Sequence, residues 1–302
     1  MNQEYGYLKS LKITVLMDDY AGYDSSLLSQ HGASYMIEAG YEDGDHKGRT
    51  ILFDTGQTAG PVLGNMEALG KDPQDIDLIF LSHCHYDHTG GLVGILQASK
   101  RCRVPVVAHP MIFRPAFTVK PAFRPVGMGP DSSPEAIREA GGEMILTGEP
   151  LSLMPGVVSS GEIKERAGFE SSPTLSLQTL QDGKQIPDQL VDDTSLIFIM
   201  NEGLVVVTGC SHAGIISIIE TALRLTGVRK VAAVIGGFHL IDGEDERIEQ
   251  TINSLSGMEV GMVYGGHCSG LKAEARLLDR LKDRFCKLRT GMVIEFPAPG
   301  EV

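Results

Sequence analysis

The chain of 302 residues lacks three features that would each define a class of protein. No stretch approaches about 18 uninterrupted apolar residues, which excludes a membrane-spanning helix. The N-terminal residues lack a basic segment followed by an apolar run, so we expect no secretory signal. Basic runs are also missing, and the formal net charge of −13 disfavours nucleic acid and anionic membranes as partners. A small phosphorylated substrate stays compatible, because a local basic pocket can outweigh the overall charge.

Cysteine is scarce as well. An odd number of cysteines at scattered spacing predicts no disulfide framework in a chain of this length. About 42% of the residues are hydrophobic, enough for a sizeable core, and a reducing cytoplasm is the expected location. The oligomeric state is left open, and a homo-oligomer is compatible with the sequence. The five cysteines are Cys84, Cys102, Cys210, Cys268 and Cys286.

The hydrophobic pattern changes along the chain. Apolar residues first alternate with period two and later recur with helical spacing between short apolar runs. This order predicts an α/β fold of layered sheets flanked by helices. Expected strands cover 11–17, 33–40, 49–56, 76–82, 195–200, 203–209, 231–237 and 260–266, with a turn-rich link over 41–48. Expected helices cover 61–70, ending at Gly70, the residues from about 213 onward, 244–255 and 271–285.

Residues 111–190 differ from the rest because they hold much of the proline and show little sustained periodicity. A structureless loop of that length is improbable inside a compact domain. We therefore interpret residues 1–302 as a single domain that carries a proline-rich insertion at about 111–190. The insertion is expected to cover the active-site cleft, either packed over it or as a lid.

The segment "SHCHYDHTGG" at 82–91 concentrates metal-binding side chains at the end of an expected strand. His83 and His85 are separated by one residue, so both imidazoles can converge on one ion. Asp87 and His88 lie one step further and can serve a second ion. Imidazole and carboxylate ligands together suit zinc, and also iron or manganese. The segment therefore predicts a site for one or two metal ions.

Three more histidines come directly after later strands. His212 follows "VVVTGC", His239 follows "VIGGF" and His267 follows "VYGG". Strand ends on one edge of a sheet can converge, so these residues are expected to join the 82–91 turn. The pattern predicts a two-metal centre with ligands from distant parts of the chain.

These residues resemble the metallo-β-lactamase superfamily, whose signature is a His-x-His-x-Asp-His turn after a strand. Here the signature is His83, His85, Asp87 and His88, followed by "TGG". The resemblance implies an αβ/βα four-layer sandwich with the metals in a cleft between two sheet edges. It also implies that Asp54, in "LFDTG", supports the metal turn without binding a metal.

The chain departs from the superfamily pattern at two positions. The usual third-motif histidine is missing from "LVDDTSL" at 190–196, so His212 is the expected third ligand of the first metal. The usual bridging aspartate is Cys210, which can ligate as a thiolate or be a small core residue. His267 fits the last ligand position, beside Asp87 and His88. His239 is additional, and substrate contact, proton transfer and a structural hydrogen bond are all open for it.

Several other side chains are weaker candidates. Arg114 and Arg124 of the insertion could pair with a phosphate or carboxylate. Asp192 and Asp193 could orient a substrate, although capping a strand is the preferred interpretation. Cys84 and Cys268 adjoin candidate ligands and are expected to point inward as small apolar groups.

The leading functional hypothesis is a metal-dependent hydrolase acting on an ester, lactone or phosphoester of a small molecule. A metal would lower the pKa of bound water, Asp87 would orient it, and His239 would protonate the leaving group. The motifs "TGCSHAG", "GGFHL" and "GHCSG" resemble a narrower group, whose namesake is the archaeal dihydropterin-methyl-ribofuranosylaminobenzene-phosphate synthase. The alternative is therefore a pterin-type transferase with a phosphorylated, pterin-like substrate. A third hypothesis is a metal-containing ligand sensor without catalysis.

Overall fold

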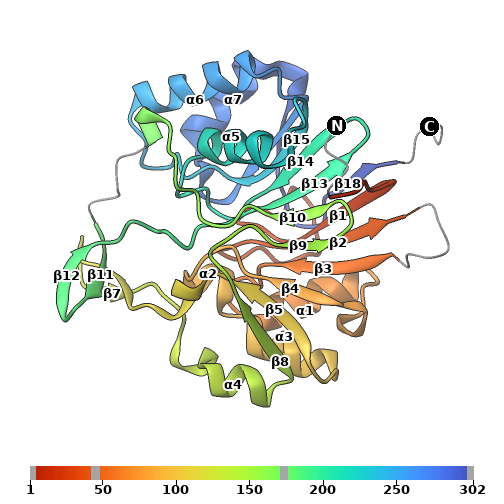
Figure 1. The fold of residues 1–302 in the computed structure, drawn as a ribbon, viewed down its shortest axis with the longest axis vertical. Coiled ribbons are helices and arrows are strands. Elements are labelled where there is room, and N and C mark those ends of the chain that lie inside the picture. Colours follow the sequence, from red (N-terminus) through yellow and green to blue (C-terminus); the bar gives the residue numbers. More distant parts are fainter. Residues whose placement is uncertain (1–4, 42–47, 171–175, 298–302) are drawn as a thin grey trace.

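The computed structural model describes residues 5–41, 48–170 and 176–297. Within them the chain forms four layers, with two β-sheets packed face to face and helices on both outer sides (Figure 1). The αβ/βα sandwich expected from the sequence is confirmed. The turn-rich link at 41–48 lies outside the described residues except for its two ends.

The first sheet has seven strands in the order β18-β1-β2-β3-β4-β5-β8. Neighbours are antiparallel from β18 to β3 and parallel from β3 to β8. In chain order the strands are β1 Ser10–Met17, β2 Ser34–Gly40, β3 Arg49–Phe53, β4 Leu78–Phe80, β5 Val104–Ala108, β8 Gly142–Leu146 and β18 Val293–Phe296.

The second sheet also has seven strands, in the order β17-β16-β15-β14-β13-β10-β9. β14, β15, β16 and β17 are parallel, so the ends of β14, β15 and β16 lie at one edge. β13 and β14 form the expected hairpin. The strands are β9 Ser152–Met154, β10 Val157–Ser159, β13 Leu196–Met200, β14 Gly203–Val207, β15 Val231–Gly237, β16 Met262–Gly266 and β17 Phe285–Lys287.

Helices cover the outer face of each sheet (Figure 1). On the first sheet lie α1 Ala59–Ala68, α3 Leu92–Ser99 and α4 Pro134–Glu139, with the short α2 Tyr86–Thr89 at its edge; on the second lie α5 Ile215–Thr226, α6 Asp245–Gly257 and α7 Leu271–Leu281. Gly70 follows α1 with φ +66°, so the expected stop is confirmed. No helix in the described ranges is both long enough and apolar enough to cross a bilayer.

Alternating side chains of the strands build three apolar cores. In β13, Leu196 and Phe198 point between the two sheets, whereas Ile197 and Ile199 point toward α5 and its neighbours. The strands of the first sheet alternate in the same way between the inter-sheet core and the helices α1 and α3. The middles of these strands are mostly apolar, and the candidate functional residues lie at strand ends.

The proline-rich stretch at 111–190 is not uniform. β8 joins the first sheet, and β9 and β10 join the second. The remaining strands form a third, four-stranded sheet in the order β12-β11-β6-β7, which we call the small sheet (Figure 1). It lies beside the sandwich and close to α2. Its strands are β6 Ala116–Thr118, β7 Arg124–Pro125, β11 Leu177–Gln181 and β12 Lys184–Pro187.

Candidate metal centre

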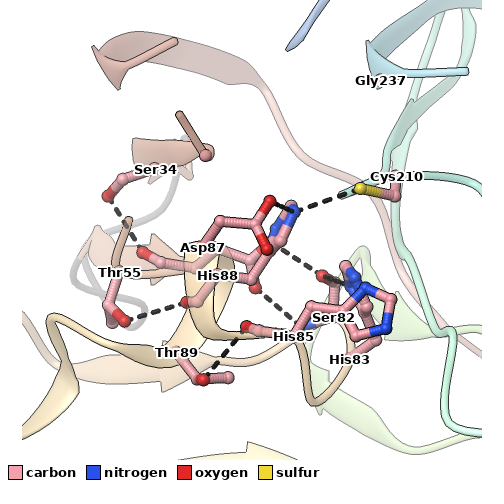
Figure 2. Close-up of polar contacts among 12 residues, drawn as sticks. Ser34, Thr55, Ser82, His83, His85, Asp87, His88, Thr89, Cys210 and Gly237 are labelled. Atoms are coloured by element: carbon pink, nitrogen blue, oxygen red, sulfur yellow. Dashed lines mark hydrogen bonds and ion pairs between the residues drawn. The ribbon is translucent and has the colours of Figure 1, made fainter. Parts of the chain in front are cut away.

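The turn after β4 is held by the buried carboxylate of Asp54. Its two oxygens accept hydrogen bonds from the backbone N–H and the hydroxyl of Ser82, each at 2.7 Å. One oxygen also lies 2.6 Å from Nδ1 of His88. That contact directs Nε2 of His88 toward Cys210, as Figure 2 shows. The contacts of Asp54 match the supporting role that the family resemblance implies.

Glycine permits this turn to pack closely. A Cβ at Gly90 would clash with the carbonyl oxygen of Gln57, and one at Gly91 with that of Thr55. Across the cleft, a Cβ at Gly209 would clash with the Ser82 hydroxyl. The diglycine and the glycine before Cys210 therefore let loops of both sheets approach one another.

A first ligand group consists of His83, His85 and His212, whose donor atoms lie within 4.8 Å of one another. Nδ1 of His85 and Nε2 of His212 face each other at 3.2 Å. Ser82 engages Nδ1 of His83 at 2.9 Å, while Nε2 of the same ring is buried without a hydrogen-bond partner. His212, on the loop after β14, thus lies beside His83 and His85.

A second ligand group consists of Asp87, His88, Cys210 and His267. The sulfur of Cys210 lies 3.2 Å from Nε2 of His88 and 3.3 Å from Nε2 of His267. One carboxylate oxygen of Asp87 lies 3.3 Å from the same two nitrogens. Figure 2 shows Asp87, His88 and Cys210 pointing toward one another. Cys210 is buried and faces other candidate ligands.

Both groups fit a bound metal ion. Two nitrogens that share one tetrahedral zinc ion lie about 3.4 Å apart, from the usual zinc–nitrogen distance. The contacts in both groups are close to this value. In the second group, His88 donates Nδ1–H to Asp54 and His267 donates Nδ1–H to Asp19 when both rings are neutral. Their Nε2 atoms are then acceptors that face the Asp87 carboxylate, and either a metal cation or a proton on each ring would satisfy them.

Electrostatics distinguishes the groups. Burial lowers the pKa of His85 to about 4 and that of His83 and His212 well below its usual value. Burial would also lower the pKa of His88, but the carboxylates of Asp87 and Asp54 raise it to about 9. The first group is therefore a set of neutral imidazoles, whereas the second attracts positive charge.

Three further side chains support the second group and were missed from the sequence. Asp19 accepts from Nδ1 of His267 at 2.7 Å, and Asp18 accepts from the His267 backbone N–H at 3.1 Å. His31 contacts the other oxygen of Asp19 at 2.9 Å and lies 3.4 Å from Asp87. The acidic pair directly after β1 was the available signal, because strand ends at this edge carry the other site residues.

Residues 190–196, the segment that lacks the usual histidine, accept hydrogen bonds from both loops that carry candidate ligands. Asp192 accepts from the backbone N–H of Cys84 at 2.8 Å, and Asp193 accepts from that of Ala213 at 2.7 Å. Both carboxylates are buried. They thus cap neighbouring loops and not the strand that follows them. Cys84 is buried in the core of the first sheet, as expected.

Arg114 does not serve as an anion site. Its side chain is buried between the carboxylates of Asp188 and Asp192, at 3.0 and 2.5 Å. The expectation that it could pair with a substrate phosphate is therefore wrong, since the protein already supplies two carboxylates. Arg124, by contrast, is exposed beside the ligand turn.

His239 and Cys268 lie next to the ligands. The ring of His239 is 4.2 Å from that of His212, centroid to centroid, and its Nδ1 is buried without a hydrogen-bond partner. Its backbone has φ +42°, and its N–H points to the sulfur of Cys268 at 3.3 Å. Cys268 is thus part of the site and not only a small apolar group.

A cavity of about 420 Å³ opens over both ligand groups. This volume suits a small-molecule ligand. Candidate ligands of both groups and His239 line one part of it, and residues of the small sheet and its loops line another. The lining includes His85, Asp87, Cys210, His212, His239 and His267 from the site, and Thr118, Lys120, Arg124 and Leu177 from the small sheet and its loops.

Comparison with known proteins gives several matches. The sequence profile of the metallo-beta-lactamase superfamily matches residues 30–161. The chain is 42% identical over 298 residues to the 7,8-dihydropterin-6-methyl-4-(beta-D-ribofuranosyl)-aminobenzene-5'-phosphate synthase of Methanocaldococcus jannaschii, which covers 98% of this chain and 100% of that protein. An uncharacterised protein of the same archaeon is 29% identical over 266 residues, covering 88% and 93% of the two chains.

Solved structures show the same fold. A crystal structure described as a metal-dependent hydrolase of the beta-lactamase superfamily has a TM-score of 0.77 at 24% identity, covering 95% of this chain and 99% of that one. Zinc-bound PqqB from Methylobacterium extorquens has a TM-score of 0.53 at 13% identity, covering 94% and 99%. At these identities the likeness shows the fold alone.

The hydrolase expected from the sequence is contradicted by these comparisons. The relative that matches along its whole length at 42% identity is a synthase. The metal-binding motifs are common to the superfamily, so they could not separate hydrolysis from a synthase reaction in a single sequence.

Proposed function

The chain belongs to the metallo-beta-lactamase superfamily, and on that premise we propose that it is a synthase that joins a dihydropterin to a ribofuranosylaminobenzene phosphate. The observation that carries this proposal is the full-length identity of 42% to a synthase of that product. The cavity over the two ligand groups has a size that suits such small molecules.

We assign a metal ion to each ligand group. His83, His85 and His212 would hold one, and Asp87, His88, Cys210 and His267 the other. Zinc suits the nitrogen-rich set, and iron or manganese also accept these ligands. When bound, a divalent ion supplies Lewis-acid stabilisation of negative charge on a leaving phosphate oxygen.

The product's chemistry defines the step. A bond forms between the amine nitrogen of the aminobenzene and the methylene carbon on the dihydropterin. The bond from that carbon to the oxygen of a leaving phosphate group breaks, and the amine loses a proton. Nδ1 of His239 lies in the site without a hydrogen-bond partner, so we assign it the role of proton acceptor.

Water must be kept from the same carbon, because its attack would waste the phosphorylated pterin. We propose that the insertion, through its small sheet, covers the cleft and selects the acceptor. Thr118 and Leu177 of this sheet line the cavity. Asp87 would then act as a metal ligand and would not orient an attacking water.

The test is acceptor dependence. Metal-loaded protein is given phosphorylated 6-hydroxymethyl-dihydropterin with and without 4-(β-D-ribofuranosyl)aminobenzene 5'-phosphate. We expect phosphate release only with the aminobenzene, together with the mass of the joined product. Equal release in water alone, with no joined product, would reject the synthase. Binding without any turnover would favour the ligand sensor.

A further inference from the structure

The cavity carries positive charge at the small sheet. Lys120 and Arg124 are the two cationic lysine or arginine side chains that line it, and both are exposed. Within the described residues, no carboxylate forms an ion pair with either of them. The protein as a whole has a net charge of −13, so two unpaired cations that line its functional cavity need an explanation.

Arg124 is held at a defined place beside the ligand turn. Its Nη1 donates to the hydroxyl of Tyr86 at 3.2 Å, and its guanidinium carbon lies 5.6 Å from the centre of that ring. The backbone N–H of Tyr86 in turn donates to Val126 at 2.9 Å. In the sequence, Tyr86 lies between the candidate ligands His85 and Asp87. Its hydrogen bonds therefore connect the small-sheet region to the ligand turn.

The two arginines of the insertion have opposite environments. Arg114 is buried and already paired with two carboxylates of the protein. Among the described residues, the Arg124 side chain donates only to a neutral phenol, which leaves most of its five N–H donors for a ligand. A planar guanidinium can bind a phosphate through two parallel hydrogen bonds, and a lysine ammonium can add a third.

We propose that Arg124 and Lys120 form a clamp for the 5'-phosphate of the ribofuranosylaminobenzene substrate. This inference rests on the proposed synthase function. The reacting methylene and the leaving phosphate belong at the metal ligands. The 5'-phosphate is separated from the attacking amine by the benzene ring and the ribose, so it belongs at a remote wall of the cavity. The small sheet provides that wall, and its two cations match the phosphate charge.

The clamp acts on binding and not on the chemical step. We therefore expect Arg124→Ala to raise KM for the phosphorylated aminobenzene about tenfold to a hundredfold, as for loss of a charge-assisted bidentate contact. Lys120→Ala should raise it less, since a lysine acts as a point charge. The kcat of both variants should stay within about threefold of wild type, since their contact is the same before and during the reaction.

The experiment compares the phosphorylated acceptor with its dephosphorylated counterpart. Wild type should prefer the phosphorylated form, and Arg124→Ala should lose most of that preference. Arg124→Lys should restore part of it. Lys184→Ala on β12 and Arg138→Ala on α4 remove exposed cations that do not line the cavity, and they should keep the wild-type preference.

Two results would overturn the clamp. One is an unchanged preference for the phosphorylated acceptor in Arg124→Ala and in the Lys120→Ala, Arg124→Ala double variant. The other is an equal fall of kcat with both acceptors, which would place the cations at the leaving phosphate. Calorimetric binding of the phosphorylated and dephosphorylated acceptors separates this proposal from the reaction itself. A phosphate preference that depends on Arg124, in a protein that forms no product, supports the clamp and rejects the synthase.

Discussion

The two ligand groups lie in one cleft, yet their surroundings differ. The first group contains three histidines and no carboxylate. The second contains Asp87 and a cysteine, and Asp54 and Asp19 engage its two histidines from behind. Burial lowers the pKa of every histidine in the first group, whereas carboxylates raise that of His88 to about 9. The first group is therefore a neutral site, and the second group is an anionic site.

This difference has a consequence for metal binding. A cation entering the second group neutralises buried negative charge, while one entering the first exchanges water for three neutral nitrogens. We expect the second group to hold its metal more tightly and the first to keep an open coordination position. Two metals of unequal affinity are thus expected in one cleft.

The largest effect is expected from removing the first group. Replacing His83 and His85 together with alanine leaves His212 alone, so this group should lose its metal. Synthase activity should fall by more than about a hundredfold, beyond the usual loss from a supporting partner. Elemental analysis should show one metal equivalent remaining in a folded protein. Full occupancy in the double variant would contradict the assignment.

The second group contains a cysteine, and cobalt tests whether its sulfur binds the metal. Cobalt-loaded wild type should show a sulfur-to-metal charge-transfer absorption that Cys210→Ser abolishes. Affinity at this group should fall by up to about a hundredfold, because a serine hydroxyl is a weaker ligand than a thiolate. Cys268→Ser is the matched control and should keep the band. If the band follows Cys268, the roles of the two cysteines are reversed.

The two carboxylates that hydrogen-bond to ligand histidines, Asp54 and Asp19, should differ in their effect on metal affinity, because they differ in exposure. Asp54 is fully buried, whereas the Asp19 side chain is 37% exposed. Asp54→Asn should weaken metal binding about a hundredfold and Asp19→Asn about tenfold, the two ends of the usual range for such partners. Chelator competition measures both. Equal effects would mean that burial does not set the strength of this support.

Much of this fold follows from local sequence pattern. The sequence alone predicted the period-two strands, the helix end at Gly70 and the histidines that follow β4, β14, β15 and β16. Each of these features depends on residues that are close together in the chain. Asp19 and His31 were not predicted, since their role arises only when the end of β1 meets the loop after β16. Arg114 was misjudged for the same reason: its partners Asp188 and Asp192 lie more than 70 residues away. The reaction was also misjudged, because ligand motifs describe the metals and not the substrate.

Anomalous diffraction from crystals of the metal-loaded protein tests the central claim directly. Data collected on either side of the metal absorption edge locate each ion without assumptions about its ligands. The account predicts two peaks, one among His83, His85 and His212 and a stronger one among Asp87, His88, Cys210 and His267. A single peak, or a peak at the second group that Cys210 does not contact, would contradict it.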